Sequence, residues 1–247
     1  MRRLSVKSQL IVFLLVFAGY VCFRNRDVSF LRTEFLALAC TALADSIVTY
    51  IKVRQWRLGE SSVVSGLIIG YVLSSDNAWW VIAVAALLAI SSKHLFRFRK
   101  RHVFNPAAFG ILLSIFMCGA TTQWQGTYLW YILVPAGCYF IYRIRKFEVI
   151  IGYAVAAVLL FGAQAVLQRM PLQNIFGYFS YFYICIMLIE PKTSPPGQTG
   201  KFVFGAIVAV LIFVFNQTGI RVDAELLSLL IGNLTVPLLQ GTRSTRP

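Results

Sequence analysis

Apolar stretches recur along the whole chain, and they set the strictest limit on what it can fold into. Ten segments rich in apolar residues are joined by short polar connections. A helix that crosses a bilayer needs about 20 mostly apolar residues. The ten candidate segments are residues 8–23, 30–51, 61–74, 77–91, 104–119, 127–142, 148–167, 173–190, 200–217 and 224–240. This pattern predicts an all-α integral membrane protein in which residues 1–247 form a single polytopic domain.

The charge content agrees with that prediction. Only 13% of the residues are charged and 58% are hydrophobic, whereas soluble proteins carry about 25% charged residues. A formal net charge of +14 would indicate a nucleic-acid partner in a soluble protein, but here the lysines and arginines lie between the apolar segments. Basic residues in that position are typical of membrane topology. We therefore expect the lipid bilayer around the chain and no bound nucleic acid.

The distribution of basic residues also predicts the orientation. If the N-terminus lies inside, the connections on the inner side hold 18 lysines and arginines, and those on the outer side hold 5. Segments that stay in the cytoplasm carry such an excess. The sequence therefore predicts a multi-pass protein of the plasma (inner) membrane with both termini in the cytoplasm.

Two of the ten segments are interrupted. Segment 61–74 is short for a crossing, and segment 173–190 stops at a Glu-Pro step. Broken helices persist in a bilayer only where protein buries their freed backbone groups. Ten segments divide into two sets of five, and an odd number per set gives opposite orientations. With weak self-similarity between the halves, this predicts two inverted five-helix repeats, about 8–119 and 127–240, whose broken helices meet at a site.

The densest basic run, residues 93–102, leads almost directly into Asn105 and Pro106. Asn is a good N-cap, and Pro suits the first helical position because it has no N–H to leave unsatisfied there. The free N–H groups of such a helix start favour an anionic or carbonyl-bearing ligand. The pair is therefore either part of a ligand site or a plain helix cap.

A second candidate lies at the end of segment 173–190. Glu190 is followed by a proline, and Thr193 adds a hydroxyl three residues later. An ionisable residue at the end of an apolar helix is a functional candidate. In the predicted topology Asn105 and Glu190 both lie near the cytoplasmic face, so we expect them to share one site.

The second apolar segment contains two acids, Glu34 and Asp45, eleven residues apart. At 100° per residue this spacing is close to three full turns, so the two side chains share one helix face. Such acids can form a cation or proton path. The alternative is that they are interfacial acids paired with Arg32 or Lys52.

Cysteine and histidine usage excludes two redox centres. The five cysteines contain no CxxC pair, and both histidines fall in the basic run. The chain therefore lacks the cysteine spacing of an iron–sulfur site and a histidine pair that could hold haem within the bilayer.

Three stretches together carry a family resemblance. They are SSKHLFRFRKRHVFNPAAF, IEPKTSPPGQTGKFVFGAIVA and AELLSLLIGNLTVPLL. With them, the chain from about residue 61 to residue 239 resembles the NqrB/RnfD family, the membrane subunits of sodium-pumping quinone reductase and of Rnf electron-transport complexes. It is most similar to the short members. The resemblance implies a fold similar to urea transporters, with ten helices in two inverted repeats.

The resemblance also implies bound flavin. It places a non-covalent flavin, riboflavin or FMN, near the cytoplasmic side at Asn105 with Pro106 and at Glu190 with Thr193. Glu190 is a departure, since the family usually has Asp there. It further places an FMN esterified to a threonine on the outer side, and CGAT makes Thr121 the equivalent. The rest of that motif is missing, so we expect non-covalent rather than covalent flavin.

These observations predict a flavin-binding membrane subunit that relays electrons, with or without coupling to Na⁺ or H⁺ movement. It would be an electron-transfer subunit rather than a stand-alone enzyme, and it would need other membrane or soluble redox subunits as partners. Two alternatives stay open at this stage. One is a transporter or channel for a small neutral solute, and the other is a scaffold subunit whose flavin site has decayed.

Overall fold

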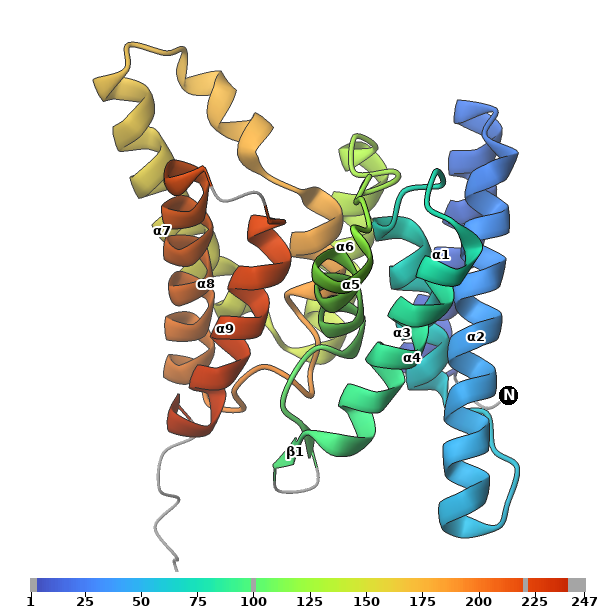
Figure 1. Cartoon of the computed structure of the whole chain (residues 1–247). Coiled ribbons are helices and arrows are strands. Elements are labelled where there is room, and N and C mark those ends of the chain that lie inside the picture. The colour runs from blue at the N-terminus through green and yellow to red at the C-terminus, as the bar shows by residue number, and fades with distance from the viewer. Residues whose placement is uncertain (1–3, 99–100, 220–221, 240–247) are drawn as a thin grey trace, which may run out of the picture. The chain divides into compact units, whose positions relative to one another are not determined.

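A computed structural model describes residues 4–98, 101–219 and 222–239 (Figure 1). Within these ranges nine α-helices follow one another along the chain. They are α1 (Val6–Asn25), α2 (Val28–Val53), α3 (Glu60–Val72), α4 (Trp79–Leu95), α5 (Pro106–Cys118), α6 (Trp130–Ile144), α7 (Phe147–Leu167), α8 (Gln198–Thr218) and α9 (Ala224–Leu239). A 3₁₀ helix, η1 (Leu172–Tyr178), and a π-helix, η2 (Tyr183–Met187), lie between α7 and α8.

Four of the described helices are long and apolar enough to cross a membrane. They are α1, α2, α7 and α8, with 20, 26, 21 and 21 residues and mean hydropathies of 2.0, 1.5, 2.2 and 2.0. This finding confirms the predicted class, a helical protein with several membrane-spanning segments. The predicted positions of both termini depend on residues 1–3 and 240–247, which lie outside the described residues.

The segments predicted to be interrupted are indeed interrupted. Helix α3 has only 13 residues, about 20 Å at 1.5 Å per residue, against a hydrocarbon core of about 30 Å. It ends because Leu73 takes an extended conformation, and the chain after it pairs with residues 121–123 through Ser74 N–H to the Thr121 carbonyl, 2.9 Å. Residues 173–190 form η1 and η2 rather than one helix, and Asn and Gly in 173–177 are weak helix formers compared with Leu.

Two local features differ from the predictions. Helix α5 also has only 13 residues, because Gly119 adopts a φ of +64° that ends it. The described part of the basic run contains two short paired strands, β1 (Arg97–Phe98) and β2 (Arg101–His102), which were not predicted.

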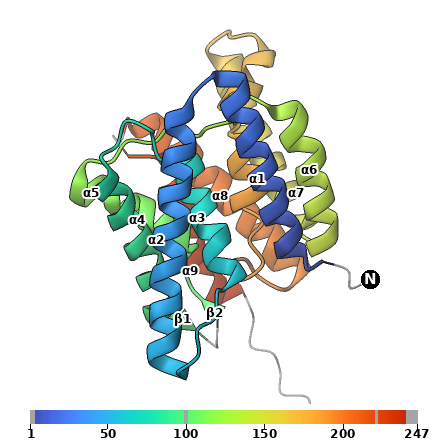
Figure 2. The same ribbon diagram turned by 90° about the vertical axis from the view of Figure 1, so that its right-hand side faces the viewer.

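The chain falls into two compact units. Unit 1 comprises residues 1–97 and 106–128 and contains α1 to α5. In it α3 packs against each of the other four helices (Figures 1 and 2). Glycines allow close approach, since a Cβ on Gly70 would collide with Glu34 of α2 and one on Gly110 would collide with the Ala85 carbonyl of α4. Small residues at such contacts are typical of membrane helices.

Unit 2 comprises residues 98–105 and 129–247 and contains α6 to α9 with η1 and η2. Helices α7 and α8 approach through reciprocal glycines: Gly152 meets the Phe202 carbonyl, and Gly205 meets the Val149 carbonyl. In unit 1, α4 packs on α2 and α5, and in unit 2, α8 packs in the same way on α7 and α9. This similarity in helix packing is what an internal repeat requires. The inverted orientation of the two repeats stays a prediction.

Candidate functional site

His102 and Glu190 connect strand β2 with the turn after η2 within unit 2. The Nε2 atom of His102 lies 3.0 Å from Oε1 of Glu190. The His102 side chain is almost fully buried, and that of Glu190 is 25% exposed. The Glu190 carboxylate is therefore fixed by a buried histidine, and part of it remains exposed at the surface of the protein.

The turn of residues 190–194 supplies further donors to Glu190. The Thr193 hydroxyl donates to Oε2 at 3.4 Å, and the Ser194 hydroxyl donates to the Glu190 backbone carbonyl at 2.8 Å. Thr193 and Ser194 are both buried. Both carboxylate oxygens thus face hydrogen-bonding groups, which fixes their direction.

Asn233 of α9 connects this turn to Asn105. Its Oδ1 accepts the Asn105 backbone N–H at 2.9 Å, and its Nδ2 donates to the Thr193 carbonyl at 3.0 Å. Both asparagines are buried, Asn233 completely. A buried polar group needs such partners, because leaving one unsatisfied costs about 1–3 kcal/mol.

Three predicted site residues, Asn105, Glu190 and Thr193, therefore belong to one hydrogen-bonded network. Pro106 begins α5, as predicted, and is buried in unit 1. Sequence reasoning missed His102 and Asn233. A signal existed for each: His102 is one of only two histidines, and Asn233 is an amide in the middle of an apolar helix.

A small recess with about 20 Å³ of free volume adjoins this network in unit 2. Four of its eight lining residues are apolar: Phe98, Val103, Val236 and Pro237. The other four are polar: Arg101, His102, Lys192 and Asn233. The recess thus combines positive charge with apolar surface.

Two buried lysines, Lys146 and Lys201, make hydrogen bonds near the start of α7. Lys146, just before α7, donates to the Pro195 carbonyl at 3.0 Å. Lys201 donates to the Arg145 carbonyl at 2.7 Å and to Glu148 Oε2 at 3.0 Å. Burial, followed by the positive charges of Lys201 and Arg101, lowers the pKa of Lys146 to about 8.

Thr121 lies in unit 1, on the exposed turn that follows α5. Asn77 makes two hydrogen bonds with the backbone of Thr121. Its Nδ2 donates to the Thr121 carbonyl at 2.8 Å, and its Oδ1 accepts the Thr121 N–H at 3.0 Å. The Thr121 hydroxyl is 3.4 Å from the same Oδ1. The turn therefore presents an exposed hydroxyl on a fixed backbone, and sequence reasoning missed Asn77.

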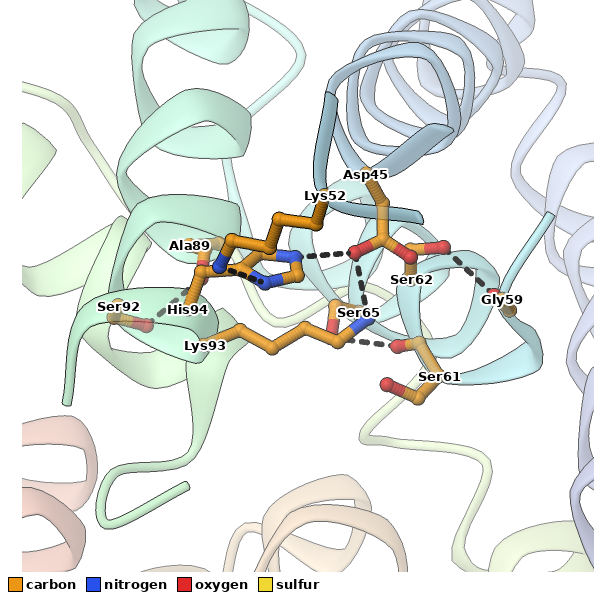
Figure 3. Close-up of polar contacts among 10 residues, drawn as sticks. All are labelled: Asp45, Lys52, Gly59, Ser61, Ser62, Ser65, Ala89, Ser92, Lys93 and His94. Atoms are coloured by element: carbon orange, nitrogen blue, oxygen red, sulfur yellow. Dashed lines mark hydrogen bonds and ion pairs between the residues drawn. The ribbon is translucent and has the colours of Figure 1, made fainter. Parts of the chain in front are cut away.

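Asp45 is buried in unit 1, where α2, α3 and α4 meet (Figure 3). Its Oδ1 lies 2.9 Å from Nζ of Lys93 and 2.8 Å from Nε2 of His94. Lys52 does not pair with Asp45, as one alternative supposed; its Nζ lies 3.3 Å from Nδ1 of His94 instead. A lysine donor at Nδ1 requires a lone pair there, so His94 is neutral and carries its proton on Nε2.

Glu34 is also buried, and it faces the backbone of α3 at Gly70. Among the described residues neither of its carboxyl oxygens has a hydrogen-bond partner. The supposed pairing with Arg32 is absent from the described part of the chain. The two acids of α2 thus differ, because Asp45 is neutralised by a lysine and Glu34 is not.

Comparison with known proteins identifies the family of the chain. Its sequence matches the model of the NQR2, RnfD, RnfE family over residues 2–133 and 126–247. The chain belongs to this family. Its relatives include a protein of Shewanella amazonensis (strain ATCC BAA-1098 / SB2B) whose name describes it as one subunit of an ion-translocating oxidoreductase complex, with 29% identity over 79 residues. That match covers 32% of this chain and 23% of the relative, so it spans less than a quarter of the relative's length.

Proposed function

We propose that the chain is a flavin-binding membrane subunit of an Rnf/Nqr-type ion-translocating oxidoreductase in the plasma membrane, and that it relays electrons between partner redox subunits. Family membership and the name of the Shewanella relative support the type of complex. The network that joins His102, Glu190, Thr193, Asn233 and Asn105 is the observation that supports a cofactor site.

The polar groups of this network suit a flavin. The flavin ring edge carries an N–H group between two carbonyls, so it needs a fixed acceptor and fixed donors. Glu190 provides a partly exposed acceptor that His102 and Thr193 hold in place. Asn105 is anchored through its backbone by Asn233. The bound flavin would supply the electron transfer, and these residues would bind it, orient it and tune its potential.

Size limits where the ring system can lie. Ligand pockets usually measure about 300–1,000 Å³, and the recess beside the network has about 20 Å³ of free volume. It cannot enclose three fused rings by itself. In this proposal the rings lie against the exposed side of Glu190, and the recess takes a smaller part of a ligand.

Cofactor extraction tests the proposal. The full chain, purified in mild detergent from its native membrane, should contain flavin that acid releases and that leaves no fluorescent band on a denaturing gel. Glu190→Ala should lose that flavin, and Glu190→Gln, which keeps the carbonyl acceptor, should lose less of it. Absence of flavin absorbance under several extraction conditions would contradict the proposal.

The same gel tests Thr121. A fluorescent band that disappears in Thr121→Val would show a covalent flavin on the exposed turn, and we expect no such band because most of the attachment motif is missing. If redox activity of the reconstituted complex were unchanged in both Asn105→Ala and Glu190→Ala, the chain would be a scaffold instead.

The ion path is proposed for Glu34 rather than for both acids. A buried carboxyl without a described partner is a candidate for binding a cation or a proton. Asp45 already has Lys93 as its counter-ion, which suits a structural link between α2 and α4. Glu34→Gln should therefore impair ion movement in liposomes while leaving flavin content unchanged.

A further inference from the structure

The recess in unit 2 is lined by two cationic side chains and, among the described residues, by no acid. Arg101 and Lys192, both exposed, line it together with the buried side chains of His102 and Asn233. Among the described residues the Arg101 guanidinium makes no ion pair.

The nearest acids do not line the recess. Glu148 pairs with Lys201, and Glu190 hydrogen-bonds to His102. Arg101 also acts on Lys146: burial, followed by the charges of Lys201 and Arg101, lowers the pKa of Lys146 to about 8. An anion bound beside Arg101 would relieve this crowding of like charges.

The size of the recess limits the anion. Its free volume of about 20 Å³ is far below the usual range for ligand pockets of about 300–1,000 Å³. It is therefore suited to a compact charged group rather than to a ring system. Val236 and Pro237 give it an apolar side, so the ligand should carry an apolar portion beside its charge.

The donors of the recess suit phosphate. A guanidinium matches the oxygens of a phosphate with two parallel hydrogen bonds, and a lysine adds a point charge. An Asn amide has two N–H groups, and Asn233 gives one of them to the Thr193 carbonyl. Its second N–H has no partner among the described residues and is available to a ligand.

We propose that this recess binds the phosphate group of a phosphate ester, either the head group of an anionic phospholipid or the phosphate of a flavin nucleotide. The inference stands beside the proposed function without depending on it, because a phospholipid would occupy the recess whether or not flavin binds nearby.

Two measurements distinguish the sources. The full chain is placed in nanodiscs of phosphatidylcholine, and its affinities for FMN and riboflavin are compared by flavin fluorescence. The detergent-purified chain is also incubated with equal amounts of phosphatidylglycerol and phosphatidylcholine, and the retained lipid is identified by native mass spectrometry. Tighter binding of FMN than of riboflavin indicates the nucleotide, and selective retention of phosphatidylglycerol indicates the lipid.

The variant Arg101→Gln/Lys192→Gln should weaken the preferred phosphate ligand at least tenfold and leave riboflavin binding unchanged. The matched control is Arg54→Gln/Arg57→Gln, which removes two exposed arginines from unit 1 that do not line the recess. The control should keep the preference of the wild type.

Two outcomes would overturn the inference. One is a wild type without preference for FMN over riboflavin and for phosphatidylglycerol over phosphatidylcholine. The other is an equal loss in the control variant, which would show a non-specific charge effect. If phosphatidylglycerol is retained selectively but neither flavin binds, the inference holds and the proposed flavin function fails.

Discussion

Single polar residues inside apolar helices organise the candidate site. Asn233 is the clearest case, because each end of its amide meets a different segment: its oxygen faces the Asn105 N–H, and its nitrogen faces the Thr193 carbonyl. The two contacts fix which way the amide points. An acid of the same shape at this position would retain the first contact and lose the second.

Asn233→Asp tests this arrangement. The new carboxyl oxygen would face the Thr193 carbonyl, so two acceptors would meet in a buried place. We expect the free energy of unfolding to fall by about 1–3 kcal/mol, measured as thermal stability in detergent, and flavin retention to fall with it. The control is Thr235→Val on the same helix, which loses only a hydrogen bond to the Gly232 carbonyl of its own turn. Equal stability of the two variants would contradict the bridging role.

Lys146 predicts a pH dependence of stability. Its pKa is about 8 in the folded protein against an ordinary 10.5, so between these values the unfolded chain binds more protons than the folded one. Stability should therefore rise as the pH increases from about 8 to about 10.5. Lys146→Met should flatten that rise in thermal melts across this range, whereas Arg143→Met, an exposed neighbour, should leave it intact. A rise that persists in Lys146→Met would show that another group causes it.

At the scale of elements, the helices of unit 1 are connected by buried ion pairs as well as by close packing at glycines. Lys93 and His94 at the end of α4 both reach Asp45 of α2, and Ser62 of α3 hydrogen-bonds to the Gly59 carbonyl beside them (Figure 3). Lys93 is itself buried. A buried lysine that loses its counter-ion is strongly disfavoured.

A double-mutant cycle measures the interaction energy between Asp45 and Lys93. Asp45→Asn should destabilise the protein by about 3–5 kcal/mol, because it leaves Lys93 buried without a counter-ion. Adding Lys93→Met should restore much of that loss, since the pair is then replaced by uncharged groups. Thermal melts of the wild type, both single variants and the double variant in one detergent give the coupling. Additive losses would show that the two side chains act independently.

The sequence predicted some of these elements well and others poorly, for physical reasons. Hydropathy identifies helices such as α7 because a long apolar run has few other folds in a bilayer. It does not set where α5 ends, which depends on the backbone conformation of Gly119. The grouping of Asn105 with Glu190 followed from topology, whereas the partner of Asp45 did not, because Lys93 lies 48 positions away and several lysines were possible.

At the scale of the whole molecule, the ends of corresponding helices in the two units share an unusual feature. Four arginines that follow α1, α2, α6 and α7 have left-handed φ angles of 53°, 55°, 55° and 54°; they are Arg26, Arg54, Arg145 and Arg169. A left-handed conformation is uncommon outside glycine. Its recurrence after the first two helices of each unit supports an internal repeat.

The inverted orientation of that repeat can be tested by labelling. In inverted repeats the ends of α2 and α7 lie on opposite sides of the membrane, and the excess of basic residues places the end of α2 inside. Arg57→Cys and Arg169→Cys report these two ends, each in a variant whose five native cysteines are replaced by serine; both positions are exposed. A membrane-impermeant maleimide added to intact cells should label Arg169→Cys and reach Arg57→Cys only after the membrane is opened. Gln123→Cys, on the exposed turn after α5, should be labelled like Arg169→Cys. If positions 57 and 169 were labelled from the same side, the two repeats would have the same orientation in the membrane. The prediction of inverted repeats, whose broken helices meet at one site, would then be wrong.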